Sequence, residues 1–82
     1  MVVFLAPGAE EIAVVASRRV GGAVARNRAR RIMREAWRQV VPQAKEDFDA
    51  VLVAKAAIRG AKTQDLVAEM TELLRRAGTV RA

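Results

Sequence analysis

The 82-residue sequence is long enough for one small domain, and it carries 15 basic against 9 acidic residues, a formal net charge of +6. It contains neither cysteine nor histidine, which excludes a disulfide framework, a thiolate metal site and a histidine general base. No uncharged stretch approaches the roughly 20 apolar residues of a membrane-spanning helix. The first charged residue is Glu10, whereas a secretory signal opens with basic residues. We therefore expect a cytoplasmic protein that has no membrane partner and is not an enzyme on its own.

The first part of the chain predicts two β-strands. Residues 2–6 are mostly β-branched or aromatic, and Pro7-Gly8 suits the two central positions of a type II turn. Residues 12–16 form a second apolar run. The two runs are expected to pair as a hairpin, and Gly21-Gly22 then breaks the strand pattern.

A helix is predicted over residues 25–41. Its apolar residues step by three and four, as one buried helical face requires. Pro42 cannot continue the helix, and the charged residues 45–47 predict an exposed loop. The apolar positions are Ala25, Ala29, Ile32, Met33, Ala36, Trp37, Val40 and Val41.

The last third predicts a strand, a connection and a helix. Residues 50–54 form the strand and residues 58–62 the connection. Thr63 is placed to cap the final helix, with Asp65 in its first turn and Arg75-Arg76 in its last turn before Gly78. The order β-β-α-β-α predicts a single α+β domain over residues 1–82, an α/β two-layer sandwich around one core.

The positive charge is concentrated in residues 17–38, which hold eight arginines and one acidic residue, Glu35. Arginine presents a planar fork that matches phosphate oxygens and stacks on bases, so a polyanion is the expected partner. On a helical wheel, Asn27, Arg31, Arg34 and Arg38 fall on one line opposite the apolar face. The arginines at 26, 28 and 30 widen the basic surface around the helix start.

Cations near a helix N-terminus oppose the helix dipole, whereas bound anions favour it. The final helix has the opposite arrangement, with its arginines at the C-terminal end, so the first helix is expected to be functional. A purely solvated face is the alternative, with Glu35 pairing with Arg31 or Arg38, but one acid cannot neutralise eight arginines. Core packing is favoured over base stacking for Trp37, while Asn27 fits either a helix start or an RNA contact. A solvated acidic loop is favoured over a metal site for Glu46, Asp47 and Asp49.

Residues 17–38 resemble the signature of the protein subunit of bacterial ribonuclease P. The shared pattern is the basic pair Arg18-Arg19, the Gly-x-Ala-Val segment of residues 21–24, Arg26-Asn27, Arg30-Arg31 and Arg34-Glu35. The strands before this segment and the strand and helix after it also agree with the family.

The resemblance implies a ribosomal protein S5 domain 2-like fold, with a left-handed β-α-β crossover from the strand ending near Ser17 to the strand of residues 51–53. It implies binding to ribonuclease P RNA and to precursor tRNA, whose 5′ leader is removed by hydrolysis that depends on Mg²⁺. Catalysis and Mg²⁺ would belong mainly to the RNA, so no catalytic or metal-binding residue is assigned to the chain. The residues matching the family's RNA-binding motif are Arg26, Asn27, Arg28, Arg30, Arg31 and Arg34, with Arg18, Arg19 and Arg38 as supporting contacts.

One departure concerns the N-terminus. Members of the family usually begin with an additional helix that carries aromatic and basic residues and helps to form a cleft for the single-stranded leader. This sequence begins at the first predicted strand and has no tyrosine. We therefore expect the fold to lack that helix, through a trimmed chain, a misassigned start or a natural short form. Leader binding through that cleft is then expected to be affected. An uncovered apolar sheet face would favour self-association.

Three other functions fit the basic helix in part. A general structured-RNA-binding or ribosome-associated module would use the same helix without ribonuclease P activity. A DNA-binding protein would place the helix in the major groove, and competition between duplex DNA and folded RNA would identify it. An independent nuclease is poorly supported because no clustered carboxylates lie beside the basic face in the sequence.

Overall fold

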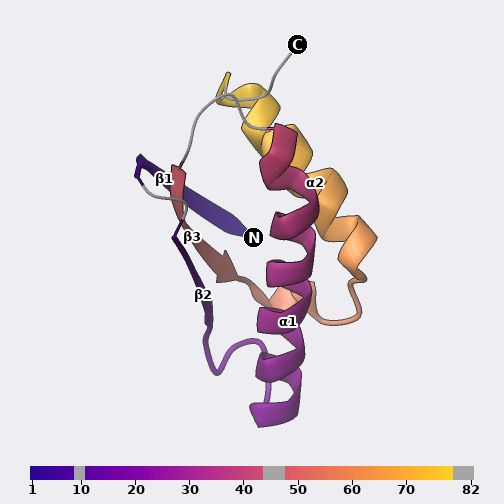
Figure 1. Cartoon of the computed structure of the whole chain (residues 1–82). Helices are drawn as coiled ribbons and strands as arrows, with labels where there is room; N and C mark the ends of the chain where they lie inside the picture. The colour runs from indigo at the N-terminus through magenta and orange to yellow at the C-terminus, as the bar shows by residue number, and fades with distance from the viewer. Residues whose placement is uncertain (9–10, 44–47, 79–82) are drawn as a thin grey trace.

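The computed structural model describes residues 1–8, 11–43 and 48–78, and it confirms the predicted α+β order. A three-stranded sheet forms one layer, and both long helices lie against the same face of it (Figure 1). No helix within the described ranges is long and apolar enough to cross a membrane. The elements are β1 (Val2–Pro7), β2 (Ile12–Ala16), α1 (Ala23–Val40), the 3-10 turn Val41–Gln43, β3 (Phe48–Ala54), the 3-10 turn Ala56–Ile58 and α2 (Thr63–Arg76).

The predicted hairpin of the first two strands is wrong. The strand order is β1-β3-β2, so β3 lies in the centre and separates the two N-terminal strands. β1 pairs with β3 antiparallel, from Val2 opposite Val53 to Pro7 opposite Phe48, whereas β2 pairs with β3 in parallel. In β3, alternate residues are buried, and Leu52 at its middle is fully buried. The central position gives this apolar strand hydrogen-bonding neighbours on both sides.

Asp49 of β3 lies beside the backbone of both Gly8, just after β1, and Glu11, just before β2. Its carboxylate accepts a hydrogen bond from the Glu11 backbone N–H at 2.9 Å, and it occupies the space where a side chain on Gly8 would lie. The predicted type II turn does not form, because Pro7 is the last residue of β1 and Gly8 lacks the positive φ that this turn requires. Asp49 therefore belongs to a strand rather than to the predicted acidic loop, while residues 45–47 lie outside the described ranges.

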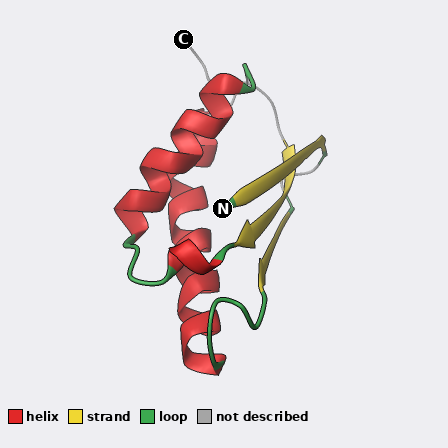
Figure 2. Cartoon of the chain, turned by 180° about the vertical axis from the view of Figure 1, so that it is seen from behind, coloured by secondary structure: helices red, strands yellow, loops and turns green. Residues whose placement is uncertain are grey.

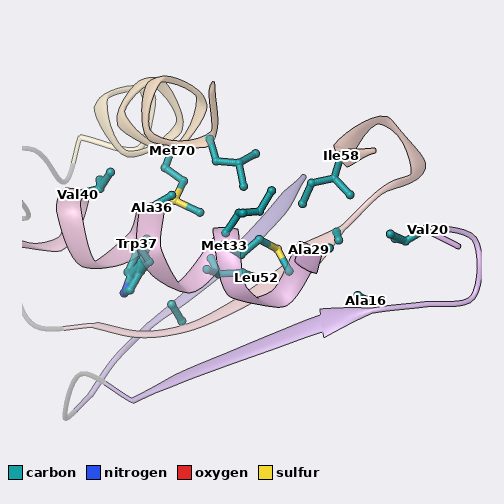
Figure 3. Packing of buried hydrophobic residues seen from close by; sticks show 14 of the residues in the cluster. Ala16, Val20, Ala29, Met33, Ala36, Trp37, Val40, Leu52, Ile58 and Met70 are labelled. Carbon is teal, nitrogen blue, oxygen red and sulfur yellow. The ribbon is translucent and has the colours of Figure 1, made fainter. Parts of the chain in front are cut away.

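The core forms where α1 and α2 cover the inner face of the sheet (Figure 3). The predicted apolar face of α1 is confirmed, because its buried residues are Ala29, Ile32, Met33, Ala36, Trp37 and Val40. Those of α2 are Leu66, Met70 and Leu74. Trp37 is 5% exposed, which confirms that its ring packs mainly in the core. The apolar face thus fixes the side of α1 that points to solvent.

The start of α2 differs from the prediction by one residue. The helix begins at Thr63 and its N-cap is Lys62, whose backbone N–H donates to Asp65 Oδ2 at 2.8 Å. The Thr63 hydroxyl instead donates to Glu35 Oε2 of α1 at 3.1 Å. Thr63 therefore links the two helices and does not cap α2. The predicted end is confirmed, with Arg75 and Arg76 in the last turn and a positive φ at Gly78.

The outer face of the sheet is apolar. Phe4, Val15 and Val51 are 59%, 45% and 39% exposed, and Phe4 and Val51 are direct neighbours across β1 and β3. Within the described parts of the chain, no helix packs on this face, as the reverse view in Figure 2 also shows.

Candidate nucleic-acid interface

The exposed side of α1 carries the predicted line of polar residues, here called the arginine row: Asn27, Arg31, Arg34 and Arg38. All four are exposed, and the buried face of the helix lies opposite them. Successive members lie about one helical turn, or 5.4 Å, apart along the axis. Packing of the apolar face therefore holds three guanidinium groups in a defined order on the surface.

The arginine row is almost free of internal ion pairs. Arg31 Nε lies 4.0 Å from Glu35 Oε1, at the limit of an ion pair, with both side chains well exposed. Arg34 and Arg38 make no ion pair or side-chain hydrogen bond with any residue that the structure describes. Glu35 also accepts the hydrogen bond from Thr63, so this carboxylate is shared with α2. The positive charge of the row is available for a bound anion.

The first turn of α1 also favours an anion. Gly22 is the N-cap and supplies no side-chain hydrogen bond, and no acidic residue stands in the first turn. The Arg26 N–H donates to the Gly22 carbonyl at 2.9 Å. The backbone N–H groups of residues 23–25 come before this bond and have no partner within the helix. These N–H groups carry the positive end of the helix dipole.

Three arginines around the helix start have individual roles. Arg28 is half-buried and donates to the Ala61 carbonyl, which ties α1 to the connection before α2. Arg30 donates to the Asn27 side-chain oxygen, so these two predicted site residues orient each other. The Nε of Arg26 is buried and has no hydrogen-bond partner. Arg28 is therefore partly structural, which its place in a motif could not indicate.

Arg18 and Arg19 lie in the turn between β2 and α1, not on the helix. The Val20 N–H donates to the Ser17 carbonyl at 3.0 Å, and the Gly21 N–H donates to the Arg18 carbonyl at 3.1 Å. Both arginine side chains are exposed. The turn thus adds two guanidinium groups just ahead of the helix start, apart from the arginine row.

The structure adds one basic residue that the sequence analysis missed. Arg59 lies after the 3-10 turn before α2 and lines a recess of about 340 Å³ together with Arg28 and Gly60. The neighbouring wall is apolar and includes Ala25 and Ala29 of α1. Arg59 is more than 20 positions beyond the arginine-rich segment, so its place beside Arg28 depends on the fold. Only its position between Ile58 and Gly60, in a connection, was visible in the sequence.

No cluster of three or more acidic side chains that could hold a metal ion occurs in the described ranges 1–8, 11–43 and 48–78. Glu46 and Asp47 lie outside those ranges, and Asp49 is engaged with the Glu11 backbone. The geometry at α1 is therefore that of an anion-binding surface with several fixed cations and an uncapped helix start.

Comparison with known proteins decides the family. The model of the Ribonuclease P family matches residues 1–78. The chain belongs to this family. It is 42% identical over 67 residues to the ribonuclease P protein component of Roseiflexus castenholzii, covering 80% of this chain and 55% of the relative. It is 45% identical over 64 residues to that of Chloroflexus aurantiacus, covering 77% and 47%. The chain thus spans about half the length of these relatives.

The fold matches those of two solved ribonuclease P proteins. The Staphylococcus aureus protein superposes with a TM-score of 0.73 at 18% identity, covering 96% of this chain and 75% of that protein. The Thermotoga maritima protein gives a TM-score of 0.72 at 22% identity, covering 90% and 74%. The order of strands and helices expected from the family resemblance is therefore the one adopted.

Proposed function

We propose that this chain acts as the protein subunit of ribonuclease P. In this proposal it binds the catalytic RNA and assists removal of the 5′ leader from precursor tRNA in the cytoplasm. The observation that carries the proposal is the arginine row, which is exposed, has only the marginal Arg31–Glu35 ion pair among the described residues, and is fixed by the buried face of the same helix. Family membership selects this RNA over other polyanions. A general RNA-binding module without this activity is the less favoured alternative.

Different residues have different roles in this proposal. Arg31, Arg34 and Arg38 bind phosphates along the helix, and the uncapped N–H groups at its start bind a further phosphate. The half-buried Arg26 and the pair Asn27–Arg30 lie next to that start, while Arg18 and Arg19 extend the surface. Because the described residues offer no acidic cluster, Mg²⁺ is assigned to the RNA, where it would supply the activated water.

Reconstitution tests the activity. The full chain is mixed with a bacterial ribonuclease P RNA at low Mg²⁺, and cleavage of precursor tRNA is measured. Stimulation over the RNA alone is expected, because bound arginines offset the charge repulsion between the two RNAs. Tight binding of the RNA without any stimulation would favour the general RNA-binding module and overturn the proposal.

The salt dependence of binding tests the phosphate contacts. The logarithm of affinity should fall with the logarithm of salt concentration by roughly 0.7 to 0.9 per phosphate engaged. Arg34→Gln should reduce this slope by about one contact. Arg75→Gln on α2 is the matched control and should leave the slope unchanged.

We also infer that the outer face of the sheet, on which no described helix packs, permits self-association. The exposed Phe4 and Val51 side chains support this inference. Sedimentation velocity over a range of concentrations tests it, with Phe4→Ser as the variant expected to remain monomeric.

A further inference from the structure

A second recess opens between the C-terminal half of α1 and the start of β2. It encloses about 210 Å³ and combines apolar side chains with two guanidinium groups. Two members of the arginine row stand at it, so the recess lies on the proposed RNA-binding surface. Its lining residues are Ile12, Arg34, Trp37, Arg38 and Val41.

Trp37 lines this recess and carries an indole N–H that makes no hydrogen bond within the described residues. Buried tryptophans usually find a partner for the indole N–H, yet no residue in the described ranges accepts one from Trp37. Among the described residues, Arg26 Nε is the one fully enclosed side-chain nitrogen or oxygen that lacks a hydrogen-bond partner. The indole nitrogen of Trp37 also lacks a partner but is not enclosed, so it is exposed at the surface. In Figure 3 it lies at the end of the ring that points away from α2. The 5% of Trp37 that remains exposed therefore includes a donor.

Part of the lining of the recess is apolar, and phosphate binding alone would not require apolar side chains there. Ile12 is on the inner face of the sheet, beside the buried Ala50, yet it is 37% exposed. Val41, just after α1, is half-buried and adds a second aliphatic side chain to the lining. A flat, partly apolar ring with polar edges matches this combination of lining and donor.

We propose that this recess takes one unstacked base of the bound RNA. Proteins read single-stranded RNA by holding splayed bases against aromatic, apolar and guanidinium surfaces and by hydrogen bonds to the base edges. Here Ile12 and Val41 contact the faces of the base, the Trp37 N–H donates to an acceptor on its edge, and Arg34 and Arg38 bind the adjoining phosphates. The inference rests on the proposed function for the presence of RNA and adds to it a contact with a base.

Intrinsic fluorescence tests the recess directly. The chain has one tryptophan and no tyrosine, so its emission reports on Trp37. The full chain is titrated with uridine and adenosine monophosphates, and separately with inorganic phosphate at equal ionic strength, with excitation where nucleotides do not absorb. Quenching by the nucleotides and none by phosphate is expected. Equal quenching by phosphate, or no quenching by either nucleotide, would overturn the inference.

A pair of variants on β2 tests the same contact in RNA. Ile12→Ser removes one apolar side chain from the lining and should weaken binding of ribonuclease P RNA by about tenfold, near the lower end of the range for a base held on an aromatic side chain, with an unchanged salt slope. Ile12→Leu is the matched control, because leucine keeps an apolar side chain of similar volume at the same position. Thermal unfolding of both variants separates binding from stability.

The outcomes distinguish the two proposals. Equal affinities of the two variants would overturn the proposed base contact, while the proposed phosphate contacts of the arginine row would still stand. Failure of the unmodified chain to bind ribonuclease P RNA would instead overturn the proposed function, and the mononucleotide titration would still decide on the recess.

Discussion

The two long helices have similar apolar faces and opposite arrangements of charge. α2 has Asp65 in its first turn and Arg75 and Arg76 in its last, which is the order that the helix dipole favours. Both arginines also pair with Glu72, at 2.7 and 3.1 Å. The polar face of α2 is therefore arranged for stability of the helix itself.

α1 shares only two of these features, Arg38 in its last turn and a marginal Arg31–Glu35 ion pair at 4.0 Å among the described residues. Its first turn lacks an acidic residue, its N-cap lacks a side chain, and Arg34 and Arg38 have no internal ion pair within the described residues. The missing acidic residue and the missing cap each lower the stability of an isolated helix by a few tenths of a kcal/mol or more. The comparison indicates that the polar side of α1 is arranged for a ligand, while its buried side provides the stability.

Reversing two charges on each helix in turn should give the largest difference in RNA affinity between α1 and α2. Arg31→Glu/Arg34→Glu replaces two positive charges beside the RNA backbone with two negative charges, so affinity for ribonuclease P RNA should fall roughly a thousandfold at low salt. Arg75→Glu/Arg76→Glu makes the same change on α2 and should alter affinity by less than about threefold. Filter binding at one salt concentration measures both. A similar loss for the two variants would show that net charge alone matters.

Shortening one buried side chain on each helix tests whether the two apolar faces contribute equally to the free energy of unfolding. Met33 of α1 and Met70 of α2 are both fully buried. Met33→Ala and Met70→Ala should each lower the free energy of unfolding by about 2–5 kcal/mol, because each leaves a cavity in the core. Urea denaturation measures the loss. A cost below about 1 kcal/mol for Met33→Ala alone would contradict the view that α1 is anchored by its apolar face.

Supplying the missing cap of α1 should separate stability from binding. A side chain at Gly22 meets nothing within 4 Å and the residue has an ordinary φ of −73, so Gly22→Asp fits without strain. It should raise the free energy of unfolding by a few tenths of a kcal/mol and weaken RNA binding several-fold, because its charge repels the phosphate. Gly22→Ser adds a cap without charge and should retain more affinity. A gain in both properties with Gly22→Asp would count against an anion at this helix start.

The smallest effect concerns Glu72 of α2. Hydrogen bonds from Arg75 and then from Arg76 lower the pKa of this carboxyl below its ordinary value of 4.5. Because the pKa is lowered in the folded chain, the stabilisation is present above the unfolded pKa and is lost as pH falls through the folded pKa. Carboxyl NMR titration should show this pKa rising in Arg75→Gln. An unchanged pKa would mean that the Arg75–Glu72 pair does not form in solution.

Local patterns predicted the helices well. The spacing of apolar residues placed α1 at residues 25–41, against Ala23–Val40 in the structure, and it identified the buried face together with the exposed arginine row. Both follow from helical geometry within a single segment. The central strand was also found, although it begins two residues earlier, at Phe48.

Contacts between distant segments could not be predicted in this way. The pairing of β1 with β3 joins residues more than 40 positions apart, and a hairpin was the simpler local solution. The same limit applies to the bond from Arg28 to the Ala61 carbonyl, which gives a motif arginine a structural task. The recess at Trp37 needs Ile12 beside α1, and nothing in the spacing of either segment indicates that neighbour.

The central position of β3 has a consequence for the growing chain. Neither N-terminal strand meets its hydrogen-bonding partner until residues 48–54 have left the ribosome, so no part of this sheet can form before β3 has been synthesised. Pairing over such separations slows folding, because long segments must be ordered before any contact compensates for the lost entropy. The arginine-rich segment is therefore synthesised before the strand that joins the other two into a sheet beneath it.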